Sequence, residues 1–122
     1  MVQRDFIAQH FLTVPNCGPE NEWHSHHFTL EVLMEGESLG EHGYLVDIDD
    51  VKAALTDLVD RYEDATMNDL PEFDGLNPSI EHFSRIFCHA FRDRIESTNL
   101  SRITVKIWED DEAWASYQSD QI

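Results

Sequence analysis

The sequence has little positive charge. Only 8 of its 122 residues are Lys or Arg, against 25 Asp and Glu, which gives a formal net charge of -17. Nucleic acids and anionic membrane surfaces are bound through clustered cations, so this balance argues against both kinds of partner. The chain also lacks an apolar run near the roughly 18 residues that a membrane span needs. The composition therefore predicts no nucleic-acid partner and no membrane partner.

Cysteine is also scarce, with Cys17 and Cys88 as the two examples. Two cysteines are too few for a disulfide scaffold, and the chain opens without a charged leader followed by an apolar run. We therefore expect a cytoplasmic protein. Cys88 adjoins an apolar helical stripe, and free cysteines are commonly buried, so we expect a small core residue there and not a nucleophile.

Repeats, linkers and low-complexity segments are absent. The length suits one hydrophobic core, and the hydrophobic fraction of 41% can fill it despite the charge. We therefore expect a single domain over residues 1–122.

Two N-terminal segments alternate apolar and polar residues with the period of a β-strand. Within residues 4–12 the even positions from Phe6 to Leu12 are apolar except for His10, and residues 24–34 continue the alternation. A polar loop over residues 15–22 joins the two segments. This arrangement predicts a hairpin with a wide loop.

Two helices are predicted next. Residues 47–50 include three aspartates, which a helix start favours, and apolar residues then recur at helical spacing up to Tyr62. Residues 63–76 are loop-like. Asn77 and Pro78 predict the N-cap and the first position of a second helix.

The C-terminal part alternates again over residues 103–108 and 113–117, with an acidic turn at residues 110–112. The element order is therefore ββααββ. This order predicts an α+β fold, with a four-stranded antiparallel sheet and two helices on one face.

Three histidines form the most informative pattern. His24 and His26 are two apart on a strand, so they project to the same side and can offer two imidazoles to one metal ion. Alone, such a pair is more often two surface histidines. His10 lies near the loop end of the preceding strand, where a hairpin brings it close to both. Three neutral imidazoles with an open fourth position predict a catalytic zinc site.

Cys17 lies in the loop between the two strands, and three interpretations of it remain open. In the first, Cys17 is an activated thiolate or general base beside the metal. In the second it is a fourth ligand that closes a structural site, and in the third it is a loop thiol without a role.

These motifs resemble those of the 6-pyruvoyl tetrahydropterin synthases and the related 6-carboxytetrahydropterin synthases. Residues 6–10 are similar to the opening strand that ends in the first zinc histidine of the family. Residues 24–28 are similar to its His-Gly-His-Asn-Tyr motif, and Cys17 stands close to the place of its catalytic cysteine. Residues 43–48 resemble the entry to its first helix.

The resemblance continues to the C-terminus. Residues 68–71, followed by residues 77–81, are similar to the Leu-Asn and Asn-Pro-Thr-x-Glu segments of the family. Glu109 matches the glutamate that anchors the pterin. A single carboxylate can accept both adjacent N–H donors on the edge of a pterin ring, so the residue type suits this role.

The resemblance implies the tunnelling fold, in which three subunits close a twelve-stranded barrel and two trimers stack into a homohexamer. Closure would remove the open sheet edges of an isolated subunit. It also implies zinc held by His10, His24 and His26, and a pterin substrate, 7,8-dihydroneopterin triphosphate.

The sequence departs from the family pattern where the family has Leu-Asp-His, with the histidine as proton relay. This chain has Tyr62, Glu63 and Asp64 there, so Glu63 or Asp64 would occupy the relay position and would need a raised pKa to act. Asp110 replaces the threonine after Glu109. The chain also has few cations for a triphosphate.

These features predict a zinc-dependent carbon–oxygen lyase that forms 6-carboxytetrahydropterin or 6-pyruvoyltetrahydropterin, with Cys17 as a proton shuttle. The alternatives are a diverged paralogue that acts on another pterin, and a catalytically silent hexamer that binds pterin and zinc.

Overall fold

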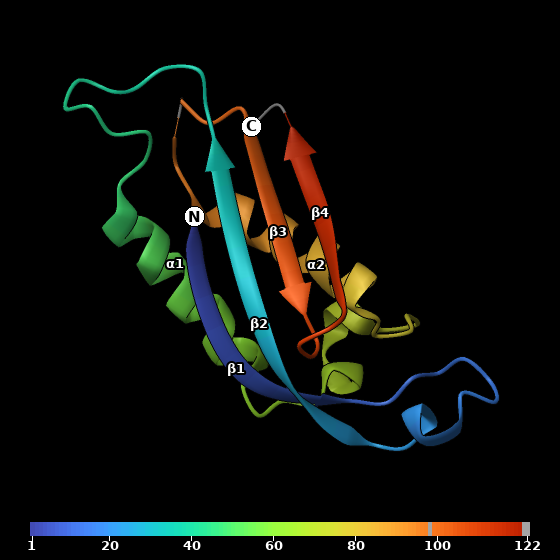
Figure 1. Cartoon of the computed structure of the whole chain (residues 1–122). Coiled ribbons are helices and arrows are strands. Elements are labelled where there is room, and N and C mark those ends of the chain that lie inside the picture. The colour runs from blue at the N-terminus through green and yellow to red at the C-terminus, as the bar shows by residue number, and fades with distance from the viewer. Residues whose placement is uncertain (98, 121–122) are drawn as a thin grey trace.

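The computed structural model describes residues 1–97 and 99–120 and contains one four-stranded antiparallel sheet (Figure 1). The strands are β1 (Val2–His10), β2 (His24–Glu35), β3 (Arg102–Trp108) and β4 (Trp114–Asp120). Neighbouring strands in the sheet are also neighbours in chain order. Two helices, α1 (Ile48–Tyr62) and α2 (Ile80–Arg94), fall between β2 and β3 in the sequence. The predicted order ββααββ is therefore confirmed.

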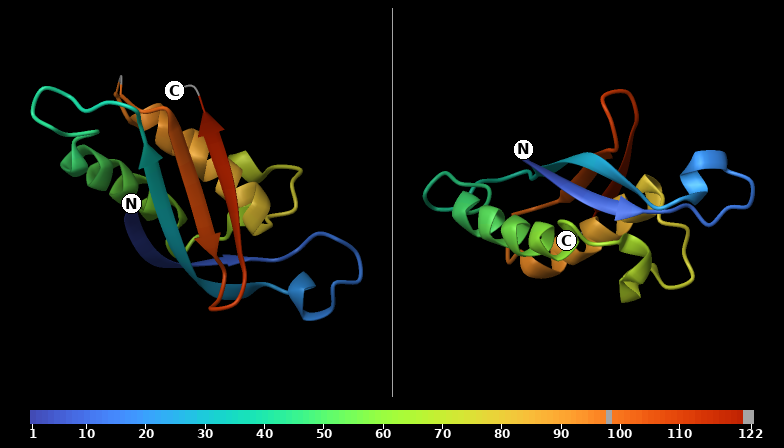
Figure 2. Two further views of the ribbon diagram at one scale, coloured as in Figure 1. Left: turned by 45° about the horizontal axis from the view of Figure 1, so that its top comes forward. Right: turned by 90° about the horizontal axis from the view of Figure 1, so that it is seen from below.

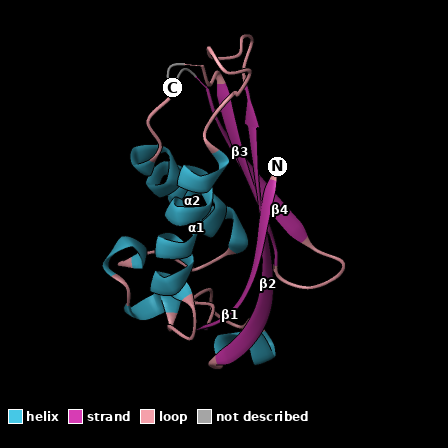
Figure 3. Cartoon of the chain, turned by 90° about the vertical axis from the view of Figure 1, so that its left-hand side faces the viewer, coloured by secondary structure: helices cyan, strands magenta, loops and turns pink. Residues whose placement is uncertain are grey.

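Both helices cover the same face of the sheet (Figure 3). The inward positions of β2 alternate along the strand, and Phe28, Leu30 and Val32 are fully buried against the helices. The outward positions between them carry polar or exposed side chains, as expected for an antiparallel sheet that packs on one side. No helix of the described chain is long and apolar enough to cross a membrane.

The pairing of β1 with β2 brings the predicted histidines to one end of the sheet. His10 lies directly opposite His24, and Ala8 lies opposite His26. A shift of one residue would turn the buried side chains of either strand outward, so the burial of this face holds the register. The connecting loop, which includes the short 3-10 helix η1 (Gly18–Asn21), extends beyond the end of the sheet (Figure 2).

The start of α1 agrees with the prediction from the sequence, and the start of α2 differs from it. Asp47 is the N-cap of α1, and its side chain accepts a hydrogen bond from the Asp49 amide at 2.9 Å. For α2 the prediction of Asn77 as the N-cap was wrong, because Ser79 caps the helix. The Asn77 side chain instead accepts a hydrogen bond from the Thr13 amide at 2.8 Å, so it supports the loop after β1.

The segment between the helices is more ordered than the loop-like prediction. It contains two short 3-10 helices, η2 (Met67–Asp69) and η3 (Pro71–Phe73). Met67 and Phe73 anchor them, with at most 1% of either residue exposed. Burial of two apolar side chains stabilises a segment whose sequence shows no regular period.

The strand boundaries also differ from the prediction. β1 begins at Val2 and ends at His10, and β4 continues beyond Tyr117 to Asp120. Cys88 is confirmed as a core residue, because it is fully buried and burial raises the pKa of its thiol to about 11.

Candidate metal centre

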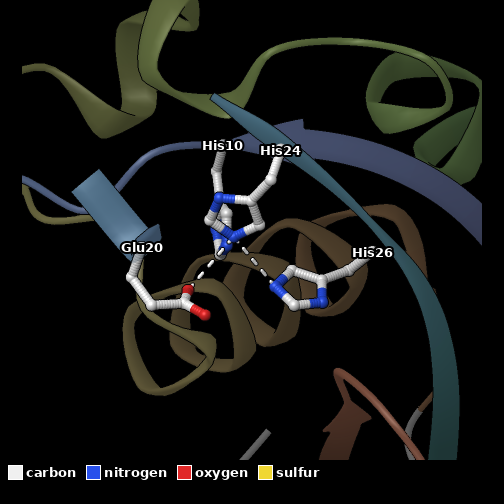
Figure 4. Close-up of side chains that lie close together, drawn as sticks. All are labelled: His10, Glu20, His24 and His26. Atoms are coloured by element: carbon white, nitrogen blue, oxygen red, sulfur yellow. Dashed lines mark hydrogen bonds and ion pairs between the residues drawn. The ribbon is translucent and has the colours of Figure 1, made fainter. Parts of the chain in front are cut away.

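The structure brings the three predicted histidines together at the end of the β1–β2 pair (Figure 4). The ring centroids of His10 and His24 are 4.6 Å apart, and those of His24 and His26 are 4.8 Å apart. A carboxylate, Glu20 of η1, joins the same cluster. One ligand atom from each of the four residues lies within 4.8 Å of the others. This set contains the nitrogen and oxygen donors that zinc accepts.

His10 is held as a neutral imidazole with one nitrogen free for a ligand. Its Nδ1 lies 2.9 Å from the Pro78 carbonyl, which can only accept, so Nδ1 carries the proton. Burial lowers the pKa of His10 to about 4, so the ring is neutral near pH 7. Its Nε2 is buried and has no hydrogen-bond partner in the described chain. Such an orphaned lone pair fits a metal ligand.

His24 has the same arrangement. Its Nδ1 lies 2.7 Å from the Glu22 carbonyl, which can only accept, so Nδ1 carries a proton and Nε2 faces the cluster. That Nε2 lies 3.1 Å from Nε2 of His26 and 3.1 Å from Oε2 of Glu20. A lone pair and a carboxylate oxygen at this distance repel unless a proton or cation lies between them. Ligand atoms of a tetrahedral site with zinc bonds of about 2.0–2.1 Å are separated by roughly 3.3 Å, so the spacing fits.

Glu20 was not predicted as a member of this cluster from the sequence. The loop fixes its backbone, because the Leu12 amide donates to the Glu20 carbonyl at 2.7 Å. The side chain of Asn21 holds the same loop through the Cys17 amide at 2.7 Å and the Val14 carbonyl at 2.8 Å. The sequence indicates this residue only through its position four residues before His24. Because the chain has 25 acidic residues, that position alone does not distinguish Glu20 from the others.

A cavity of about 580 Å³ opens beside the cluster. It is lined by His10, Leu12, Glu20, Ser79, Ile80, Glu81, Glu109, Glu112, Ala113 and Trp114. The volume lies in the range of small-molecule sites. Glu109 is partly buried at the end of β3, and this burial raises the pKa of its carboxyl group, while His26 opposes the shift. The predicted pterin anchor therefore lies in the same cavity as the histidine cluster.

The other predicted residues lie outside this lining. Cys17 is half-buried in the loop, where its amide bonds to Asn21. Glu63 is the exposed C-cap of α1. The Asp64 amide donates to the Ile7 carbonyl at 2.7 Å, which places its backbone beside β1. Within one subunit the cluster and the cavity are therefore formed without these three side chains.

The fold and the cluster define a class of protein: an α+β chain whose four-stranded sheet carries a candidate metal site at the end of its first hairpin. A family model described as 6-pyruvoyl tetrahydropterin synthase matches residues 1–120. The chain belongs to the 6-pyruvoyl tetrahydropterin synthase family.

Solved structures support the fold. The chain is similar to a Plasmodium vivax 6-pyruvoyltetrahydropterin synthase, a catalytic-residue mutant in which alanine replaces glutamate. The TM-score is 0.81, at 12% identity over 98% of this chain and 96% of that chain. It is also similar to Caenorhabditis elegans 6-pyruvoyl tetrahydropterin synthase, with a TM-score of 0.81 and 17% identity, over 98% of this chain and 93% of the other.

An uncharacterized protein from Wolinella succinogenes has a TM-score of 0.72 and 15% identity, over 95% of this chain and 94% of that one. The comparison with curated proteins found no match. At these identities the structural likeness establishes the fold of the chain, and the predicted α+β architecture, a four-stranded antiparallel sheet with two helices in the order ββααββ, is confirmed.

Proposed function

We propose that this chain is a zinc-dependent carbon–oxygen lyase that acts on the side chain of a 7,8-dihydropterin. The observation that carries the proposal is the buried, unpartnered Nε2 of His10, which faces His24 and His26 beside a cavity that contains Glu109. His10, His24 and His26 would hold the metal. Zinc bound there supplies Lewis acidity toward the side-chain oxygens of the pterin.

Glu109 is proposed to bind the pterin ring. A half-buried carboxylate has lost part of its hydration, and two N–H donors from the ring edge would restore hydrogen bonds to both oxygens. The carboxylate is also close enough to His26 for the two groups to interact electrostatically. Anchoring the ring at Glu109 would therefore leave its side chain near the metal ligands.

Glu20 is proposed as the group that moves the proton. Its carboxylate lines the cavity and lies against His24, whereas Cys17 lies outside the lining. The Plasmodium vivax enzyme described above has a catalytic residue that is a glutamate in its unmutated form. Cys17 as shuttle and Glu63 or Asp64 as relay are the alternatives to this assignment, and each would have to reach the cavity from a neighbouring copy or by movement of its segment.

Assembly into a homohexamer, a dimer of trimers, is part of the proposal. β1 and β4 are the edge strands of the described sheet. Residues 64–66 already bond to the outer edge of β1 at Ile7 and Gln9, so the remaining hydrogen-bonding groups are on β4 and on the first part of β1. The substrate is 7,8-dihydroneopterin triphosphate or another pterin. A diverged paralogue is favoured over the parent activity by the loss of the relay histidine and by the acidic lining of the cavity.

The test is turnover of 7,8-dihydroneopterin and of its triphosphate by the zinc-loaded protein, with products identified by mass spectrometry. We expect Glu20→Gln to keep its zinc and to lose about 10²–10⁴ in rate, since proton-transfer groups contribute this much. Cys17→Ala serves as the matched loop variant and should retain most of the activity.

The reverse result, with Cys17→Ala inactive and Glu20→Gln active, would return the proton transfer to Cys17. A protein that binds zinc and pterin but converts neither substrate would be the silent hexamer. Absence of zinc from the purified protein would contradict the whole proposal.

A further inference from the structure

The cavity beside the histidine cluster is acidic, which is unusual for a site that would bind a phosphorylated substrate. Four of its ten lining residues are glutamates, namely Glu20, Glu81, Glu109 and Glu112, and none is Lys or Arg. A zinc ion held by the histidines would offset two of these four negative charges. A triphosphate would bring further negative charge into the same space.

Two arginines of the chain are paired with acids away from this cavity: Arg61 pairs with Glu72 at 2.6 Å, and Arg102 pairs with Asp120 at 2.7 Å. Lys106 projects from the outer face of the sheet and lies over the ring of Trp114, a residue of the cavity lining, at 3.8 Å from the ring centroid. All eight Lys and Arg residues lie outside the lining of this cavity.

Each copy of the chain has a net charge of -17, so a second copy adds to the negative potential of the assembly as a whole. Electrostatic potentials sum over the assembly, and a cavity with walls of one sign concentrates them.

The acidic lining belongs to a built site and not to an ordinary solvated surface. His10 lines the cavity and is 1% exposed, with its Nε2 unpartnered in the described chain. Glu109 is held beside it in a partly buried position. Asp110, Glu20 and Glu81 each raise the pKa of Glu109 further, which shows that these acids act on one another.

We propose that this cavity selects pterins whose side chain carries no phosphate, such as 7,8-dihydroneopterin, and rejects the triphosphate; this inference rests on the proposed function, and with such a substrate the side-chain hydroxyl group lost when the C–O bond breaks would leave as water. Repulsion by Glu81 and Glu112 acts against the phosphate tail while leaving the ring contacts unchanged. Like charges brought together at a binding site carry a large penalty, so discrimination of about tenfold or more is expected.

The experiment is calorimetric titration of the zinc-loaded protein with 7,8-dihydroneopterin and, separately, with its triphosphate. We expect the unphosphorylated pterin to bind at least about tenfold more tightly at low salt, and the difference to shrink at about 1 M salt, where the Debye length is only ~3 Å.

Charge reversal at the cavity provides the specific control. Glu112→Lys, at an exposed position of the β3–β4 turn, should improve binding of the triphosphate about tenfold and leave the unphosphorylated pterin nearly unchanged. Glu81→Gln should act in the same direction with a smaller effect. Glu96→Lys makes the same change in net charge just beyond the C-terminal end of α2, about 20 Å from Glu81, and should change neither affinity.

Tighter binding of the triphosphate by the unaltered protein would overturn this inference and leave the proposed function intact. An equal effect of Glu96→Lys and Glu112→Lys would also overturn it, because net charge and not the cavity would then set the preference. Failure of the zinc-loaded protein to bind either pterin would overturn both proposals together.

Discussion

The protonation of single histidine nitrogens decides what the cluster can do. In His10 and in His24 a backbone carbonyl accepts from Nδ1, so each ring presents its Nε2 to the same point. Such outer contacts fix the orientation and tautomer of a ligating ring. Two residues far apart in the sequence, Glu22 and Pro78, therefore prepare the site through their carbonyl groups.

His10→Ala should remove the metal. The change deletes a buried ligand from a set of three histidines, so zinc content should fall from about one ion per chain to a small fraction after dialysis, as measured by atomic absorption. His27→Ala is the matched control, because His27 is exposed on the opposite side of the same strand as His26. Zinc retained at the wild-type level in His10→Ala would contradict the assignment of the ligand.

The sequence predicted the histidines and missed the carboxylate for a physical reason. Strand alternation fixes the side on which His24 and His26 project, so two of the ligands follow from a period of two. The direction of Glu20 depends on a short 3-10 helix and on the side chain of Asn21, which accepts one hydrogen bond from the loop and donates two to it. Contacts of this kind leave no periodic signal in the sequence.

At the scale of elements, the segment after α1 is held on its exposed side by hydrogen bonds to the carboxylate of Glu72. Arg61 donates two hydrogen bonds to Glu72, and the hydroxyl group of Tyr62 donates a third at 2.8 Å. The Arg61 contact lowers the pKa of Glu72 to about 2. This contact joins the end of α1 to η3 and thus shapes the segment that precedes α2.

The contribution of Glu72 to stability should depend on pH. Its pKa is lower in the folded protein than in the unfolded chain, so the stabilisation is present above about pH 4.5 and is lost as the pH falls toward 2. Glu72→Gln should lower the free energy of unfolding by about 1 kcal/mol at pH 7. Below pH 3 most of this difference should disappear, as measured by urea unfolding.

Asp60→Asn is the control for this experiment, since Asp60 is exposed on α1 and has no hydrogen bond or ion pair within the described residues. A difference between Glu72→Gln and wild type that stays constant from pH 7 to pH 3 would contradict the role of the ionised carboxylate.

The elements themselves were predictable where a period or a cap was present. Asp47 was identified because acids accumulate at a helix start, and the buried faces of both helices follow helical spacing. Asn77 and Ser79 are both good capping residues, and the choice between them depends on Thr13, which is distant in the sequence. The η2 and η3 helices depend on burial of Met67 and Phe73, which no local pattern indicates.

At the scale of the whole molecule, the outer edge of β4 and the first part of the outer edge of β1 are available to another copy, whereas residues 64–66 occupy β1 at Ile7 and Gln9. Light scattering should therefore give a particle of six times the 14.2 kDa subunit mass at moderate salt. Lower salt should favour trimers, because a charge of -17 on each subunit opposes the stacking of two rings when screening is weak. A monomer at every concentration and salt would contradict the proposed assembly.

The hydrogen bond from His10 to the Pro78 carbonyl has a consequence for how the molecule unfolds. Pro78 precedes the cap of α2, so an ion held by His10 would tie β1, the η1 loop and the start of α2 at one point. Thermodynamic linkage is reciprocal: if these segments must be folded to bind the ion, then the bound ion stabilises their folded state. At a free metal concentration of about 1,000 times Kd, binding would raise the free energy of unfolding by roughly 4 kcal/mol. The ion would then act as a reversible cross-link in a chain that has no disulfide among its described residues.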